Sequence, residues 1–335
     1  MDLRTTYLGL ELPHPLMPGA SPIPDLLDRA RRLEDAGAAA IVLRSLFEEQ
    51  ILQDDLSAGL YVEGPMESYA EALSYFPRPD SFALGPFEYL EHLRRLRAAV
   101  SVPLIASLNG TTLGGWLEYA QFIQDAGADA LELNVYRLPV RPEEDAVEVE
   151  RETVEMVRAV KRTVRVPVAV KLSPFYTSLP AFAEQLRRAG ADGFVLFNRF
   201  LQPQIDPDSL SVSARIDLST PADQRLPMTW IAILRGRIGA SLAASGGVET
   251  GADLARYLLA GADVVMSTSA LLRHGRDHAG VLLSELVEWM RAKELASLDD
   301  VRGLMSVERE PDPETRRRAG YVGMLEAAKQ TFTGL

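Results

Sequence analysis

The stretch RAGADGFVLFN, residues 188–198, joins the end of a predicted helix to a predicted buried strand. Ala-Gly-Ala also occurs at residues 36–38, 126–128 and 260–262, and an apolar run follows each copy. Glycine just past a helix end adopts the left-handed cap conformation at little cost. An unbroken apolar run is typical of a strand that is buried on both faces. The repeat therefore predicts helices and strands that alternate around a parallel sheet.

Eight strand-like segments are predicted along the chain, four after the Ala-Gly-Ala repeat and two after Val-Pro pairs. Eight strand–helix units predict an α/β fold, a single (β/α)8 TIM barrel with its active site at the carboxyl ends of the strands. Long segments at residues 46–86 and 199–226 follow the second and sixth strands, and we expect them to form binding loops at that end. The expected strands are residues 15–21, 39–45, 103–108, 130–135, 167–172, 193–198, 241–244 and 263–267.

The length of 335 residues would allow two domains, but barrels of this type commonly form one. We expect the barrel at residues 1–293. Residues 294–335 are expected to form a C-terminal helical extension that packs on the barrel or at an interface.

Composition excludes several classes of function. The chain has no cysteine, which excludes disulfides, thiolate metal sites and a cysteine nucleophile or base. Its net charge of −12 argues against nucleic-acid binding, because phosphate contacts need a basic face. No apolar run reaches the ~20 residues of a membrane helix, and the four histidines show no metal-ligand spacing at strand ends. We expect a cytoplasmic protein without a bound metal.

Polar residues stand where the predicted strands end. Lys171 closes a buried strand, where an amine is costly unless it is paired or used. It is suited to a Schiff base or to facing an electron-rich ligand, while an ion pair at the barrel mouth remains the structural alternative. Asparagine amides offer donors and an acceptor for a heterocycle edge or a carboxylate. The other residues at these ends are Ser21, Arg44, Ser45, Asn109, Asn134 and Asn198.

The last two predicted strands end in turns that are suited to a phosphate group. Ser245-Gly246-Gly247 precedes one predicted helix, and Thr268-Ser269 precedes another. Backbone N–H groups at such positions bind anions, and barrels commonly bind phosphate between these two loops. Ordinary tight turns would explain each motif singly, but the pair on neighbouring strands favours phosphate binding.

Several of these motifs together resemble the dihydroorotate dehydrogenase family, especially its soluble class 1 type, over residues 3–293. A closer resemblance is to the group called dihydroorotate dehydrogenase-like proteins, through LRSLFEEQI (43–51), LFNRFLQP (196–203) and LSTP (218–221). The family motifs are YLGLELPHPLMPGAS (7–21), ALELNVYRLP (130–139), VPVAVKLSP (166–174) and SGGVETGADLARYLLAGADVVMSTSALL (245–272).

The resemblance implies a barrel that holds one noncovalent FMN. Lys171 and Asn134 would contact the polar edge of the flavin, and Asn198 would face the substrate. The expected substrate-binding residues are Arg44, Asn109, Asn198 and Arg199. The implied cofactor-binding residues are Ala20, Ser21, Arg44, Ser45, Asn134, Lys171, Ser219, Ser245, Gly246, Gly247, Thr268 and Ser269.

The chain departs from the family at the catalytic base. The family motif Asn-x-Ser-Cys-Pro-Asn uses its cysteine as the base, and the same register places Arg137 at that position. An arginine with a pKa above ~12 cannot act as a base at neutral pH. Tyr136 is an alternative acid, and Lys171 completes the catalytic candidates. With Arg44 and Arg199, Arg137 would form an anion-binding mouth suited to a carboxylate substrate.

The resemblance therefore predicts an FMN-dependent oxidoreductase, a flavoprotein that transfers a hydride to or from FMN N5 and acts on a CH–CH group. Three alternatives stay open: a genuine dihydroorotate dehydrogenase of pyrimidine metabolism with a non-cysteine base, a Schiff-base lyase that uses Lys171, and an FMN-binding electron-transfer subunit. The expected partners are a small-molecule substrate, a second copy in a homodimer, and an iron–sulfur or other electron-transfer chain.

Overall fold

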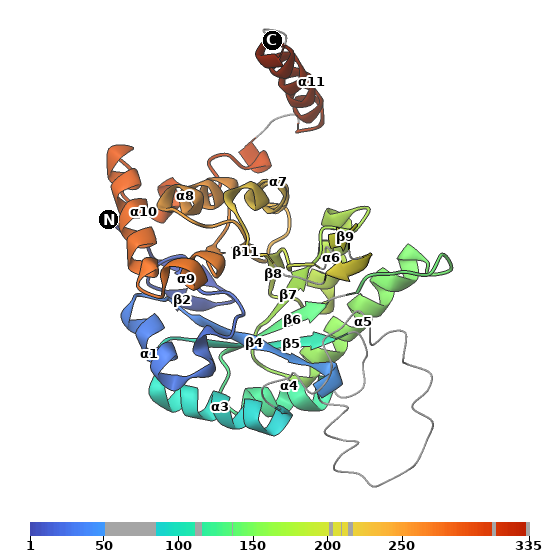
Figure 1. Cartoon of the computed structure of the whole chain (residues 1–335), viewed down its shortest axis with the longest axis vertical. Helices are drawn as coiled ribbons and strands as arrows, with labels where there is room; N and C mark the ends of the chain where they lie inside the picture. Colours follow the sequence, from blue (N-terminus) through green and yellow to red (C-terminus); the bar gives the residue numbers. More distant parts are fainter. Residues whose placement is uncertain are drawn as a thin grey trace.

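The computed structural model describes residues 1–50, 85–110, 116–135, 137–200, 204–208, 210–213, 217–309 and 313–332 (Figure 1). Its eight-stranded sheet has the order β3-β12-β11-β8-β7-β6-β5-β4, and neighbouring strands are parallel. A parallel bridge between Ser21, which follows β3, and Leu43 of β4 joins the two ends of the sheet. The predicted (β/α)8 barrel is therefore confirmed. The strands are β3 (Leu16–Met17), β4 (Ile41–Phe47), β5 (Leu104–Gly110), β6 (Ala130–Val135), β7 (Val168–Leu172), β8 (Gly193–Leu196), β11 (Ser241–Ser245) and β12 (Val264–Met266).

Helices surround this sheet on its outer side (Figure 1). Apolar residues at helical spacing, such as Leu179, Phe182, Ala183 and Leu186 of α6, form the buried layer between helices and strands. None of the helices in the described residues is long and apolar enough to cross a membrane. The helices are α1 (Leu27–Asp35), α3 (Pro86–Ala99), α4 (Trp116–Asp125), α5 (Ala146–Thr163), α6 (Leu179–Ala189), α7 (Arg225–Leu234), α8 (Gly251–Ala260), α9 (Ser269–His274), α10 (His278–Ala292) and α11 (Pro313–Phe332).

A second apolar cluster fills the barrel interior near the amino ends of its strands. It takes small or flexible side chains from every barrel strand, including Ala130 and Ala169. The hairpin of β1 (Thr5–Tyr7) and β2 (Leu10–Leu12) adds Tyr7 and other apolar side chains to this cluster. Because apolar side chains fill this end, the interior is a packed core, and the polar residues lie at the other end.

The Ala-Gly-Ala repeat has a specific packing role, seen in the copy before β8. Gly190 caps α6 with φ +113°, and a Cβ there would lie 2.6 Å from Cγ of Lys161. Asp192 follows it, and its carboxylate accepts the backbone N–H of Val168 at 2.8 Å and forms an ion pair with Lys161. The same arrangement recurs with Gly127, Asp129, Leu104 and Arg97 and with Gly261, Asp263, Leu242 and Arg235. The repeat thus joins a helix to the next strand. In these three copies the aspartate that follows the repeat accepts a backbone N–H at the start of the neighbouring strand.

Among the differences from the sequence-based expectations are the first strand and the second long segment. The first strand was expected at residues 15–21 but is only Leu16–Met17, since the segment after it turns toward α1 through a short 3-10 helix, Ile23–Asp25. The second long segment contains an unpredicted antiparallel hairpin, in which β9 (Gln204–Asp206) pairs with β10 (Ser211–Ser213). Most of the first long segment lies outside the described residues.

The C-terminal extension has two parts. Leu298 and Val301 are buried, and Gly303 donates its N–H to the carbonyl of Leu258 at 2.9 Å, so this part packs against α8. Helix α11 stands away from the barrel (Figure 1), and large apolar side chains such as Tyr321 and Met324 are exposed on it. That α11 packs on the barrel or at an interface remains a prediction.

Candidate active site

The carboxyl ends of β5, β6 and β7 bring three predicted site residues to one level. Asn109 lies opposite Asn134 in the register of β5 and β6, and Asn134 lies opposite Lys171 in that of β6 and β7. Asn134 and Lys171 are buried. In the described part of the chain, the side-chain amide of Asn109 makes no hydrogen bond, and neither does that of Asn198, just after β8. Polar groups with unused hydrogen-bonding capacity thus meet at this end of the barrel.

Lys171 forms a buried ion pair that sequence reasoning missed. Its ammonium donates to Glu132 Oε1 at 3.2 Å, and the side chain of Glu132 is almost wholly buried. The signal was available, because Glu132 stands two residues before Asn134 and so shares its face of the strand. An ion pair was the structural alternative for Lys171, but its partner lies on the core side of the lysine and was not identified. The pair leaves two further N–H groups of the ammonium for other acceptors.

The pair belongs to a chain of side chains across neighbouring strands. Ser107 Oγ donates to Glu132 Oε1 at 3.5 Å, and it lies 2.8 Å from Ser45 Oγ. A serine hydroxyl both donates and accepts, so Ser45 can donate to Ser107 while Ser107 donates to Glu132. Residues from β4, β5, β6 and β7 are linked in this way.

Two buried acceptors beside Lys171 have no hydrogen-bond partner among the described residues, namely Glu132 Oε2 and Asn134 Oδ1. A buried acceptor without a donor costs about 1–3 kcal/mol, and native proteins contain few of them. Asn134 lies at the strand end, where a bound molecule with an N–H group would satisfy its oxygen. The geometry therefore indicates a ligand-binding site here.

The turns after β11 and β12 lie together with Ser219. Ser219 Oγ donates to Ser269 Oγ at 2.9 Å and accepts the N–H of Gly247 at 3.0 Å. Gly246 and Gly247 have φ +99° and +71°, and a Cβ on Gly247 would lie 2.6 Å from the carbonyl oxygen of Thr220. Thr268 Oγ1 accepts the N–H of Gly19 at 3.1 Å, which connects this end to the segment containing Ala20 and Ser21.

This cluster brings together the residues that were predicted to bind the phosphate, namely Ser219, Gly246, Gly247, Thr268 and Ser269. Arg273, which sequence reasoning missed, also reaches it, since its guanidinium donates to the carbonyl of Ser219 at 2.7 Å. Ser245 ends β11 directly before the two glycines.

The three arginines expected to form an anion-binding mouth all have carboxylate partners. Arg44 lies 3.6 Å from Asp25, and Arg199 lies 3.9 Å from Asp223. Arg137 pairs with Glu144 at 3.2 Å and closely with Glu152. These ion pairs connect the three arginines to the surrounding loops and helices. Tyr136, the other predicted catalytic residue of this segment, lies outside the described residues.

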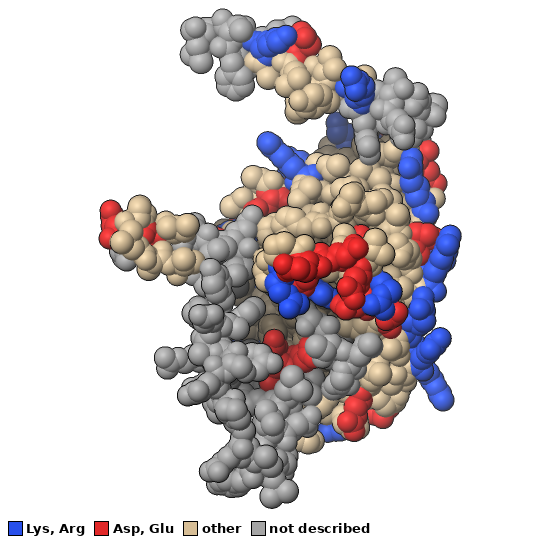
Figure 2. Space-filling model, turned by 90° about the vertical axis from the view of Figure 1, so that its right-hand side faces the viewer, with Lys and Arg blue, Asp and Glu red and all other residues tan. Residues whose placement is uncertain are grey.

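The pairing of Arg137 also fixes its charge. The hydrogen bond to Glu152 is the main cause that raises the pKa of Arg137 above its ordinary value. This side chain is therefore a permanent cation and no base. On the face where α5 lies, acidic and basic side chains are interspersed (Figure 2), and ion pairs such as Arg151 with Glu155 contribute to that pattern.

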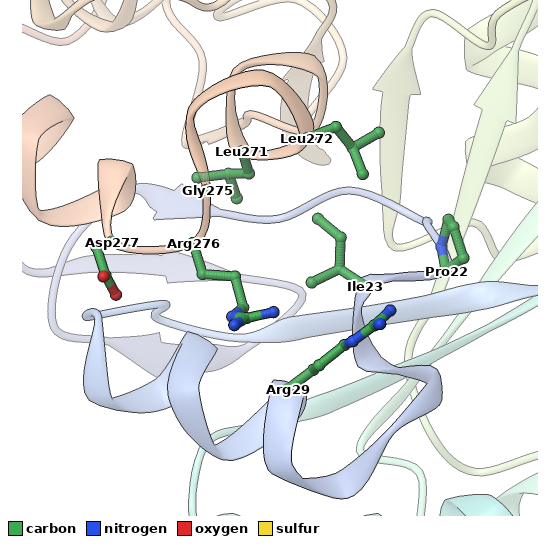
Figure 3. Close-up of a pocket in the computed structure, with 8 residues that line it drawn as sticks. All are labelled: Pro22, Ile23, Arg29, Leu271, Leu272, Gly275, Arg276 and Asp277. Carbon is green, nitrogen blue, oxygen red and sulfur yellow. The ribbon is translucent and has the colours of Figure 1, made fainter.

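A separate cavity of about 320 Å³ lies between α1 and α9, outside the strand ends. Arg29 and Arg276 point into it beside Ile23 and Leu271 (Figure 3). None of the predicted site residues lines it. Across the described residues, no group of three His, Asp or Glu side chains is arranged to hold a metal ion.

A closed parallel barrel with unpaired polar groups at its strand ends defines a (β/α)8-barrel enzyme. Residues 84–290 match the family described as dihydroorotate dehydrogenase, which is more than half of the chain. The chain belongs to the dihydroorotate dehydrogenase family and is an oxidoreductase.

Named relatives support this assignment. The chain is 27% identical to the dihydroorotate dehydrogenase B (NAD(+)) catalytic subunit of Thermoplasma acidophilum over 314 residues, which are 90% of this chain and 98% of that protein. It is 32% identical to the same subunit of Anoxybacillus flavithermus over 173 residues, 50% of this chain and 55% of that protein. It is 24% identical to the NAD-dependent dihydropyrimidine dehydrogenase subunit PreA of Escherichia coli K12 over 327 residues, 90% of this chain and 76% of that protein.

Proposed function

We propose that this protein is an FMN-dependent oxidoreductase that acts on a CH–CH group of a small substrate. The observation that carries the proposal is the buried Asn134 Oδ1, which has no donor among the described residues and lies on the strand next to Lys171. The polar edge of a flavin alternates carbonyl acceptors with one N–H donor. An unpaired amide oxygen and an ammonium with unused N–H groups are complementary to such an edge.

The residues present fit FMN at its other end as well. Ser219, Gly247 and Ser269 are already linked by hydrogen bonds, and Gly246 faces open space where a Cβ would meet no atom within 4 Å. Hydroxyl and backbone N–H donors beside small residues suit a phosphate group. Ala20, Ser21, Arg44, Ser45, Ser245 and Thr268 complete the proposed cofactor-binding residues.

When bound, FMN would supply hydride transfer at N5, chemistry that no amino-acid side chain provides. Lys171 would hold a positive charge against the polar edge, and Asn134 would orient that edge. Asn109, Asn198, Arg44 and Arg199 are the proposed substrate-binding residues. Arg137 stays charged and therefore serves in positioning, and Tyr136 is the proposed proton donor. A carboxylate-bearing substrate is proposed because three arginines belong to the mouth, although each would have to share its charge with the acidic residue that it already pairs with.

An electron-transfer partner is part of the proposal. The relatives from Thermoplasma acidophilum and Escherichia coli are named as subunits, one of them catalytic, so they work with other chains. Because this chain has no cysteine, any iron–sulfur cluster would be held by the partner. We also propose that the chain forms a homodimer.

The visible spectrum of the purified protein tests the proposal. We expect flavin absorption, and FMN rather than FAD among the material released by denaturation. A colourless protein that takes up no added FMN would contradict the proposal. Such a result would favour the Schiff-base alternative. Borohydride trapping of a substrate on Lys171 would then test that alternative.

The substrate is tested separately under anaerobic conditions. Bleaching of the flavin by dihydroorotate would support the alternative of a genuine dihydroorotate dehydrogenase with a non-cysteine base. Bleaching by a dihydropyrimidine or by another carboxylate, without a response to dihydroorotate, would support a related substrate. A flavin that no such compound reduces, but that a redox partner protein reduces, would support the electron-transfer subunit.

A further inference from the structure

Glu132 is a buried charged group beside the proposed flavin site, and the proposed function leaves it without a role. We propose that Glu132 is a positioning residue, the counter-charge that holds the Lys171 ammonium in place and thereby sets how readily the bound flavin accepts electrons. The inference rests on the proposed function, because it assigns Lys171 to the flavin edge. It is carried by the burial of Glu132, its contacts and the register of three strands.

The burial of Glu132 demands a partner. Its relative exposure is 0%, and its neighbours in the strand register are Ser107 on β5 and Ala169 on β7. An ionised carboxylate in such surroundings is costly unless a cation and hydrogen bonds compensate it. Within the described residues, Lys171 is its ion-pair partner.

The register explains how the Lys171 ammonium can contact both the Glu132 carboxylate and a ligand at the strand ends. Glu132 lies opposite Ala169, one inward-facing position below Lys171, while Asn134 lies opposite Lys171 itself. The ammonium therefore has its carboxylate partner on the core side. Its remaining donors are available toward the strand ends, beside Asn134 Oδ1.

Ser107 holds the carboxylate from the other side, and Ser45 lies within hydrogen-bond distance of Ser107. Ser107 Oγ donates to the same Oε1 that accepts from Lys171. Because the carboxylate accepts from both Ser107 and Lys171, it is held in place and in turn holds the lysine. The lysine side chain is therefore ordered before a ligand binds. Pre-ordering of this kind reduces the entropy lost on binding.

The pair also sets the net charge beside the ligand. Lys171 and Glu132 together are neutral, so the positive field at the flavin edge is weaker than that of a lone lysine. Replacing the carboxylate by an amide of the same shape would leave the ammonium uncompensated. A cation near the flavin favours the reduced, more negative form, so the midpoint potential is expected to rise in Glu132→Gln.

A double-mutant cycle on the FMN-bound protein tests this inference. Midpoint potentials are measured by equilibration with reference dyes for wild type, Glu132→Gln, Lys171→Met and the double variant. We expect Glu132→Gln to raise the potential by more in the wild-type background than in the Lys171→Met background, where no ammonium remains for the carboxylate to hold. Equal shifts in both backgrounds, or no shift in either, would overturn the proposal.

Two controls keep the outcomes separate. Ser107→Ala removes one hydrogen bond to Glu132 but keeps the ion pair, so its potential should shift by less than that of Glu132→Gln. Thermal unfolding of each apoprotein reports whether the fold is intact. Should Glu132→Gln not fold, Glu132→Leu, which also removes the charge, takes its place, and an unchanged potential then counts against the proposal. A wild-type protein that binds no flavin would contradict the proposed function rather than this inference.

Discussion

Gly247→Ala is expected to weaken FMN binding by about 100-fold or more, which corresponds to ~3 kcal/mol. Gly247 has φ +71°, and its new Cβ would lie 2.6 Å from the carbonyl oxygen of Thr220 and 2.7 Å from Cγ of Gln224. The left-handed conformation costs an alanine about 1–2 kcal/mol, and overpacking adds about 1–3 kcal/mol. Relief of the clash would separate Gly247 from Ser219, whose hydroxyl accepts its N–H at 3.0 Å.

Fluorescence titration of the apoprotein with FMN measures this effect. Gly239→Ala is the matched control, since Gly239 has φ +54° with no atom within 4 Å of a new Cβ and lies at the opposite end of β11. It carries backbone strain of the same kind away from the proposed phosphate turn, so FMN affinity should stay at the wild-type value. Wild-type affinity in Gly247→Ala would show that the phosphate binds elsewhere.

Asp263→Ala is expected to lower the free energy of unfolding by about 3–5 kcal/mol, the usual cost of removing one partner of a buried ion pair. Its carboxylate accepts the N–H of Leu242 at 2.9 Å and lies 2.9 Å from Arg235 and 3.4 Å from Arg302. The substitution would leave a buried N–H group and two largely buried arginines without their acceptor. It would also loosen the C-terminal segment, because Arg302 belongs to it.

The loss is measured as the change in unfolding free energy of the apoprotein in urea, so that cofactor binding does not contribute. Asp35→Ala is the control, because Asp35 is exposed at the C-terminal end of α1 and caps no strand. Its expected effect is within about 0.5 kcal/mol. Similar losses in the two variants would contradict the capping role of the aspartate.

Much of the fold was predictable because its signals are local. Gly127, Gly190 and Gly261 adopt φ values of +100°, +113° and +120°, and the apolar runs after them are buried strands. The hairpin of β9 and β10 was missed, since its short strands expose apolar side chains such as Ile205 and carry no burial pattern. The first strand was predicted too long because the small residues that follow Met17 leave the strand, and of these only Ser21 forms an isolated bridge, to Leu43.

The candidate site was only partly predictable. Lys171, Asn134 and Gly247 followed from strand ends and turn motifs, and the structure places each of them at the expected end of the barrel. Sequence reasoning did not find Glu132 or Arg273. Their roles depend on partners 39 residues away, in Lys171, and 54 residues away, in Ser219.

The sequence by itself determined the order of the barrel strands, the positions of the glycine caps and the end of the barrel where the candidate site lies. These features depend on the conformation of one residue or on the burial of one short segment. Only the tertiary structure decided which charges meet. Arg137 became an ion-pair partner of Glu144 and Glu152, and Lys171 became the partner of Glu132. Charge pairing requires the register of strands and helices that are distant in the chain, and a buried charge is stable only where that register supplies its counter-ion.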